Sequence, residues 1–297
     1  MAVTTGDEKL DLREPAGWRR ASDRIATVVM VIAFVLVIIP LAFVLFTVVA
    51  KGISVISAQF LFTGPIPPNT APADVGGIGP AVLGTIEITA IATILAVPLG
   101  ILGAIYLNEY GGKGWLSALI GFMSDVMTGV PSIVMGLFIF SIWVLHFGYS
   151  GLAGAFALGC LMLPVVIRSS YEMLRLVPNS LREGSYALGA TKSRVTMTVV
   201  LPAALGGIVS GSLLAVARAA GETAPLLFTI LTVTEANPNV FSGPNTVLAT
   251  QIFVNATQPF TGAQQRAWGA ALTLIAIAFI LMIAARIVTA RFTRYSR

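Results

Sequence analysis

Long apolar stretches alternate with short polar segments along this chain. Six of the stretches reach the roughly 17 residues that an α-helix needs to cross about 30 Å of hydrocarbon. They cover residues 25–50, 79–108, 115–147, 151–167, part of 203–234 and 268–289. The pattern predicts an all-α integral membrane protein with six transmembrane helices.

The stretch at residues 115–147 is longer than one crossing requires, because a single helix of that length would extend about 50 Å. Its expected break is at Pro131, since proline removes a backbone donor and ends or kinks a helix. We expect an interfacial or tilted helix before this break. The fifth stretch is treated as one long element that can break between Gly221 and Pro225, and Pro98 predicts a kink in the second stretch.

Composition and charge agree with a membrane protein. Apolar residues make up 56% of the chain and charged residues only 10%, whereas about a quarter of the residues of a soluble domain are charged. Lys and Arg gather in the cytoplasmic loops of membrane proteins. Fifteen of the 18 here fall before the first stretch, after the second, between the fourth and fifth, and from Arg286 onward, while Lys51 and Arg266 fall on the opposite side. Six crossings with both termini in the cytoplasm fit this asymmetry.

This topology divides the chain into three parts. Residues 1–24 are predicted to form a cytoplasmic N-terminal tail, residues 25–290 the six-helix transmembrane domain, and residues 291–297 a cytoplasmic C-terminal tail. Within the domain, a cytoplasmic loop covers residues 169–202. The same positive-inside bias accounts for the pI near 9.7, so we expect no nucleic acid among the partners.

Few residues of this chain can carry enzyme chemistry. Cys160 is the single cysteine and His146 the single histidine, so the chain alone can build neither an internal disulfide nor a Cys/His metal cluster. It contains neither the G-x-x-x-x-G-K-[ST] motif of ATP-hydrolysing phosphate loops nor the H-E-x-x-H motif of zinc enzymes. We therefore expect no resident metal or cofactor, and a membrane-embedded enzyme is disfavoured.

The predicted cytoplasmic loop is amphipathic and reads as two short helices. Ser180 and Glu183 have the spacing of a capping box, which predicts that a helix starts at Ser180. Gly189 is placed to end it in a left-handed conformation. Thr191 can cap the second helix, which Pro202 is expected to close. Two interpretations stay open: a docking element for a cytoplasmic partner, or an amphipathic pair that lies on the lipid.

Arg218 is the cation expected deepest in the membrane. It follows Ala203 by 15 residues, about 22 Å along a helix that enters from the cytoplasm. An arginine at that depth costs about 2.5 kcal/mol or more, so it usually faces a bundle interior or a wet cavity. Glu222 follows four residues later and can pair with it. The pair indicates either an anion path, in which the guanidinium fork binds an oxyanion, or a structural ion pair between spans.

Other residues in the apolar stretches also predict specific contacts. Arg168 is expected near the inner face, where its side chain can snorkel to water. Glu87 and Asp125 are expected to pair with partners on other helices. Gly207 and Gly211 form a G-x-x-x-G pattern, which predicts a close approach of two helices.

The second half of the cytoplasmic loop resembles a known element. Glu183, Gly184, Ser185 and Gly189, with Leu201-Pro202 downstream, resemble the EAA loop of ABC importer permeases. In that family the loop forms a coupling helix that inserts into a groove of the ATPase subunit. Gly184 and Ser185 replace the usual pair of alanines, and both are small, so close approach of a partner backbone is preserved.

Four further stretches resemble the phosphate-specific ABC importer, in particular its PstA-type permease. They are GGIGPAVLGT at 76–85, PLGILGAIYLNEYG at 98–111, GVPSIVMGLF at 129–138 and RAAGETAPLLFT at 218–229. With the EAA-like loop, the resemblance covers about residues 76–230. It implies the fold of a type I ABC importer permease, MetI-like, in the cytoplasmic inner membrane.

The resemblance also implies a function and a set of partners. The chain would form half of the translocation path for inorganic phosphate, within membrane lipid, beside a PstC-type sister permease. A dimeric ABC ATPase would supply the energy, and an external phosphate-binding protein would deliver the ion. Arg218 and Glu222 would lie on the path, and Arg168 is a second candidate near its cytoplasmic exit.

Two other classes of transporter stay open. An importer of the same architecture could carry another oxyanion, such as molybdate or sulfate, although the RAAGETAP segment resembles the phosphate permeases. A secondary carrier driven by protons or sodium would commonly show internal repeats and more membrane carboxylates. Such a carrier would not need an amphipathic cytoplasmic loop.

Overall fold

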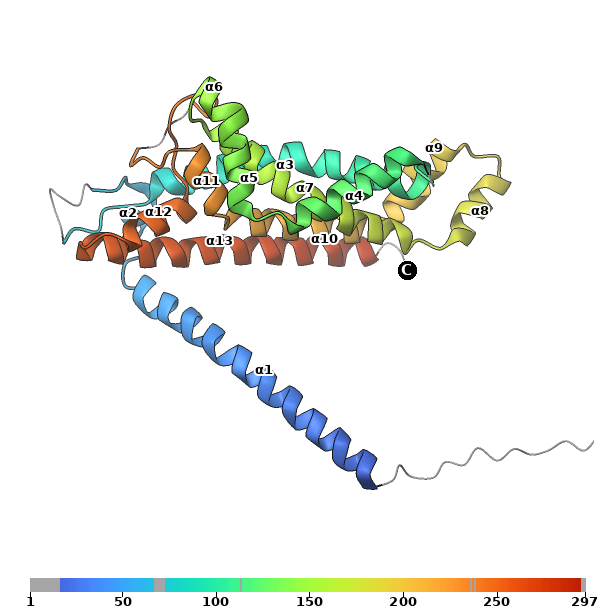
Figure 1. Ribbon diagram of the computed structural model, residues 1–297, viewed down its shortest axis with the longest axis horizontal. Helices are drawn as coiled ribbons and strands as arrows, with labels where there is room; N and C mark the ends of the chain where they lie inside the picture. The colour runs from blue at the N-terminus through green and yellow to red at the C-terminus, as the bar shows by residue number, and fades with distance from the viewer. Residues whose placement is uncertain (1–16, 67–72, 113, 236, 238, 295–297) are drawn as a thin grey trace, which may run out of the picture. The chain divides into compact units, whose positions relative to one another are not determined.

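The computed structural model describes residues 17–66, 73–112, 114–235, 237 and 239–294, and the regular structure within them is helical (Figure 1). Five helical segments are long and apolar enough to cross a membrane, and a bent pair, Trp115–Gly129 with Ser132–Phe147, makes a sixth candidate. The five are Ala21–Gly52, Gly79–Tyr110, Gly151–Arg175, Lys192–Ala220 and Thr261–Ala284. The predicted all-α membrane fold is confirmed.

The chain separates into two units, residues 1–49 and 50–297. The described part of the first unit belongs to α1 (Gly17–Gly52), an apolar helix with Pro40 in its interior. The second unit contains α2 (Ala58–Phe62), α3 (Gly79–Ile105), α4 (Trp115–Gly129), α5 (Ser132–Ile139), α6 (Leu145–Phe147), α7 (Gly151–Arg175), α8 (Asn179–Ala187), α9 (Lys192–Val195), α10 (Leu201–Ala220), α11 (Ala224–Thr229), α12 (Leu248–Ala256) and α13 (Thr261–Arg294).

The core of the second unit is built around α7. This helix packs against α3 and α10, and α10 in turn packs against α13, so that these long helices lie roughly alongside one another (Figure 1). The apolar side chains that they enclose include Ile88, Leu158, Met162 and Val216. Leu226 of the short helix α11 joins the same core.

Small residues let α10 approach α7 closely. A Cβ atom built on Gly211 would lie 2.6 Å from the Cβ of Ser169, and one built on Gly207 would overlap the side chain of Met173. Between helices in lipid, close van der Waals packing replaces the hydrophobic driving force that operates in water. The helix contact predicted from the G-x-x-x-G pattern is confirmed.

Pro131 breaks the third apolar stretch where the sequence predicts. The helices on either side of Pro131 are bent by 109° relative to each other, and Pro131 itself is the residue before α5 begins. α5 continues through a π-helical turn, Phe140–Val144, into α6. α4 packs on α7, while α5 packs on α11. The break therefore turns α5 away from the direction of α4.

The start of α8 differs from the prediction. The helix begins at Asn179, the residue before it is Pro178, and no side-chain hydrogen bond caps it. The capping box of Ser180 and Glu183 is therefore wrong. The prediction fails because Pro178 has an extended backbone and the Pro178 carbonyl already accepts the Leu181 N–H at 3.2 Å. Ser180 therefore lies inside the first turn of the helix.

The boundary between the two short helices follows the prediction. Gly189 adopts a φ of +80°, which is the left-handed conformation expected after a helix. Thr191 is the residue before α9, as predicted, but its side chain makes no capping hydrogen bond. The turn between α8 and α9 is thus set by the glycine backbone.

Pro202 does not close a helix, so that prediction is wrong. The chain is helical from Lys192 to Ala220, because α9 passes through a π-helical turn, Thr196–Val200, into α10. Hydrogen bonds in such a turn span five residues, so the ladder shifts just before Pro202, which has no N–H to contribute. The fifth candidate span therefore starts at Lys192, about three helical turns before residue 203.

The predicted break in the fifth stretch is confirmed. α10 ends at Ala220, and Pro225 lies in the first turn of α11. The Gly221 and Glu222 N–H groups donate to carbonyls three residues back, at 3.1 Å each, which tightens and ends the helix. Pro98 lies inside α3, which runs through it as one helix, and the kink expected there stays a prediction.

Candidate functional site

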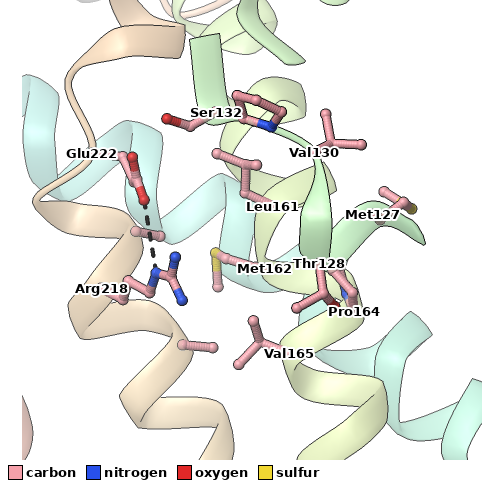
Figure 2. Close-up of a pocket in the computed structure, with 13 residues that line it drawn as sticks. Met127, Thr128, Val130, Ser132, Leu161, Met162, Pro164, Val165, Arg218 and Glu222 are labelled. Carbon is pink, nitrogen blue, oxygen red and sulfur yellow. Dashed lines mark ion pairs between the residues drawn. The ribbon is translucent and has the colours of Figure 1, made fainter. Parts of the chain in front are cut away.

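Arg218 lies in the last turn of α10, and Glu222 lies just beyond its end. The Arg218 Nε and Glu222 Oε1 atoms are 3.8 Å apart, a loose ion pair between residues four apart. Figure 2 shows the two side chains on the same side of α10, facing the α4–α5 break and α7. The predicted pairing is confirmed.

A cavity of about 230 Å³ adjoins this pair. Its walls come from the α4–α5 break, the middle of α7 and the end of α10, and they include Thr128, Ser132 and Met162 (Figure 2). Among its lining residues, Arg218 and Glu222 are the charged ones. The Arg218 side chain is 73% exposed and that of Glu222 22%. The guanidinium therefore faces open space with most of its donors available.

Arg168 lies at a second cavity, of about 330 Å³, which α4 and α7 line with Ser117, Ser124 and Tyr171. Its Nη1 atom is 3.3 Å from Asp125 Oδ1, so the predicted pairing of Asp125 with a neighbouring helix is confirmed. Arg168 and Arg218 line separate cavities along α7. The structure does not bring the two arginines into one site.

Glu87 does not have the partner that the sequence predicts. It is half-buried in α3, but no ion pair or side-chain hydrogen bond involves it among the described residues. The reason is that Arg168 of α7 and Arg218 of α10, two cations of the neighbouring helices, pair with other carboxylates.

The EAA-like residues lie on α8 and the turn after it. Glu183 and Gly184 are exposed, and a Cβ atom built on Gly184 would meet nothing within 4 Å. Ser185 donates its hydroxyl to the Leu181 carbonyl at 2.8 Å, within the same helix. Leu188, at the end of α8, is 90% exposed. This surface has acidic, small and large apolar side chains that nothing in the described chain covers.

Comparison with known proteins decides the family. Residues 96–294 match the family model described as "Binding-protein-dependent transport system inner membrane component". Phosphate transport system permease protein PstA 1 of Mycobacterium tuberculosis is 42% identical over 285 residues, which cover 94% of this chain and 91% of that protein. PstA of Yersinia pestis is 41% identical over 94% of both chains. PstA of Haemophilus influenzae is 40% identical over 86% of this chain and 89% of that protein.

This chain belongs to the PstA permease family.

Solved structures agree with the fold of a PstA-type inner membrane permease. A chain of the MetNI methionine ABC transporter, in an inward-facing conformation, superposes with a TM-score of 0.60 at 17% identity and covers 71% of this chain and 94% of that one. A chain of a bacterial alginate ABC transporter superposes with a TM-score of 0.63 at 13% identity and covers 94% and 99%. The expected type I ABC importer permease fold is thereby shown, in a multi-pass protein of the inner membrane.

Sequence reasoning missed one ion pair of this PstA-type permease. Arg182 of α8 lies 2.9 Å from Glu109 through Nη2 and Oε1, and their side chains are only 13% and 5% exposed. The pattern predicted Arg182 to be one of the cations of the cytoplasmic loop 169–202, and Glu109 directly follows the second apolar stretch, 79–108. A usable signal was available: both residues belong to the segments that carry the family resemblance, NEYG and the EAA-like loop.

Sequence reasoning also misjudged Arg266, which it placed in a loop. Arg266 belongs to α13 and is 2% exposed. Its guanidinium donates to the Val75 carbonyl at 2.6 Å, the Ile66 carbonyl at 2.9 Å and Asn255 Oδ1 at 3.2 Å. These contacts tie the segment before α3 and helix α12 to α13. The role of Arg266 is therefore structural, because all three acceptors belong to the chain itself.

Proposed function

We propose that this chain forms half of the translocation path of an ATP-driven phosphate importer, with Arg218 as the main contact for the ion. One observation carries the proposal: the Arg218 guanidinium faces a cavity and, among the residues that the structure describes, is held only by a loose contact to Glu222. A planar fork of N–H donors suits phosphate oxygens, which accept two parallel hydrogen bonds. The substrate follows from the PstA relatives, whose names describe phosphate transport system permeases.

Glu222 has a complementary role in this proposal. Its carboxylate holds the guanidinium when the path is empty and accepts a hydrogen bond from the P–OH group of the hydrogen phosphate ion when it is occupied. The 3.8 Å separation is longer than a strong hydrogen-bonded ion pair, so an arriving anion displaces a weak contact. Release stays possible because the site offers one cation only.

Arg168 forms a second anion-binding site on the proposed path. It follows the first cavity along α7 toward the helix end that carries α8, and Asp125 partly neutralises it. We place that end in the cytoplasm, together with residues 1–24, the segment 169–202 and residues 291–297. The concentration of Lys and Arg in these parts supports the orientation.

The partners follow from surfaces that this chain leaves open. A sister permease would close the path around Arg218 and Arg168, whose side chains are 73% and 63% exposed. An ATPase dimer would dock on α8 through Glu183, Gly184, Ser185 and the turn at Gly189. The exposure of Leu188 supports a protein partner there, since a large apolar side chain in water gains from burial. A binding protein would deliver phosphate to the opposite face.

Reconstitution of the complete complex in proteoliposomes tests this function. We expect uptake of radiolabelled phosphate that requires ATP, the ATPase subunit and the binding protein, and that excess sulfate or molybdate does not displace. Vesicles that contain this polypeptide alone should accumulate nothing. Uptake by the isolated chain under a proton or sodium gradient would contradict the proposal, and displacement by molybdate or sulfate would assign a different oxyanion.

A further inference from the structure

Every N–H donor of the Arg182 guanidinium has an acceptor. Nε and Nη2 donate to Glu109 Oε1 at 3.3 and 2.9 Å. Nη1 donates to the Val177 carbonyl at 2.6 Å and to Asn179 Oδ1 at 3.2 Å. Nη2 also donates to the Leu174 carbonyl at 3.0 Å. These five contacts equal the number of donors that a guanidinium has.

The carboxylate of the pair is equally well enclosed. The Glu109 side chain is 5% exposed, and its Oε1 atom also accepts a hydrogen bond from Asn108 Nδ2 at 2.7 Å. Two charges withdrawn from water are costly unless geometry and additional hydrogen bonds compensate. The contact is therefore a specific connection, unlike the exposed ion pairs at Arg168 and Arg218.

The connection joins three elements. Glu109 belongs to the π-helical turn, Tyr106–Tyr110, that ends the α3 span, and Leu174 belongs to the last turn of α7. No residue of α8 is buried. Among the described residues, every side-chain hydrogen bond from α8 to another element is made by Arg182. Arg182 is thus the point at which α8 is fastened to the ends of α3 and α7.

We propose that Glu109 and Arg182 are positioning residues that transmit the displacement of α8 to α3 and α7. This inference rests on the proposed function, in which an ATPase moves α8. A guanidinium held at all its donors is a planar fork that resists rotation, whereas a lysine ammonium is a point charge on a flexible stem. Movement of α8 then carries the end of α7, the helix that lines both cavities.

The test compares transport with ATP consumption in the complete reconstituted complex. The variants are Glu109→Gln, Arg182→Gln and Arg182→Lys, and the matched control is Arg175→Gln, which removes an exposed cation from the last turn of α7. Three quantities are measured: the ATPase that co-purifies, the rate of ATP hydrolysis, and phosphate uptake. A purely structural role would change all three together.

We expect Glu109→Gln and Arg182→Gln to retain the bound ATPase and its rate of ATP hydrolysis, while phosphate uptake falls. The number of ATP molecules consumed per phosphate imported should then rise about tenfold, which is the effect of losing about one charge-assisted hydrogen bond. Arg182→Lys should give a smaller rise, and Arg175→Gln none.

An unchanged ratio of ATP consumed to phosphate imported in the Gln variants would overturn the inference, and so would uptake that falls only in proportion to the assembled complex. If the Gln variants do not assemble, an unchanged ratio in Arg182→Lys overturns it instead. Failure of the proposed function is separate, because it would already appear as absent phosphate uptake in the wild-type complex.

Discussion

Arg168 of α7, which lines the second cavity, forms an ion pair with Asp125 of α4 across 3.3 Å. Their side chains are 63% and 65% exposed. An exposed pair of this kind contributes only about 0–1 kcal/mol to stability. Asp125 therefore orients Arg168 more than it holds α4 on α7, and most of the arginine side chain stays exposed.

This geometry predicts unequal effects of the two residues on transport. Arg168→Gln should lower phosphate uptake about tenfold, because a hydrogen bond to a charged group contributes about 1.5–3 kcal/mol. Asp125→Asn should change uptake less than about twofold and leave thermal stability in detergent unchanged, since the lost pair is exposed. Initial uptake rates and a melting curve check both. An Asp125→Asn variant as defective as Arg168→Gln would show that the pair is required as a unit.

Replacement of Arg218 tests the main anion-binding site of the proposed path. Arg218→Gln should abolish phosphate uptake, which means a fall in the uptake rate of at least about tenfold. The complex should still assemble, because the Arg218 side chain is largely exposed and supports no packing. Arg218→Lys should retain part of the activity, since it keeps the charge but loses the bidentate fork. Uptake and co-purification of the ATPase are measured together. Normal uptake in Arg218→Gln would exclude this residue from the path.

A charge reversal on α8 tests docking of the ATPase. Glu183→Lys should reduce co-purification of the ATPase, and with it phosphate uptake, because it reverses an exposed charge at the proposed interface. Glu235→Lys makes the same change at an exposed position outside α8 and serves as the control. We expect the control to behave as wild type. Equal ATPase retention and equal uptake in the two variants would place the interface elsewhere.

The contact between Gly211 and Ser169 predicts a stability effect that a second mutation reverses. Gly211→Ala should lower the apparent melting temperature, because its Cβ would lie 2.6 Å from the Ser169 Cβ, and overpacking costs about 1–3 kcal/mol. In the background of Ser169→Gly, the same change should cost little, since that side chain is then absent. Gly184→Ala, at an open position, is the control for adding a methyl group. An equal loss in both backgrounds would contradict this packing.

The architecture of this protein follows largely from local chemistry. Apolar stretches long enough to cross hydrocarbon, a proline at residue 131 and a left-handed glycine at 189 each act over a few neighbouring residues, so the spans, the break and the turn were predictable. The spacing of Arg218 and Glu222 predicted their pairing for the same reason. The start of α8 was misplaced because Pro178 and Ser180 both favour a helix start, and pattern alone does not rank them.

The partners of Arg182 and Arg266 lie in distant segments, and the sequence pattern did not identify them. Glu109 and Arg182 are 73 residues apart; Glu109 follows the second apolar stretch, and Arg182 belongs to the predicted cytoplasmic loop. Arg266 was expected on the side opposite the cytoplasm, whereas the structure encloses it between α12, α13 and the segment before α3. Such partners depend on how helices pack, a property of the whole chain. Residue types and their spacing therefore define a membrane permease with an arginine that we propose to lie on its path, while three-dimensional packing determines which charges stay exposed and which fasten one helix to another.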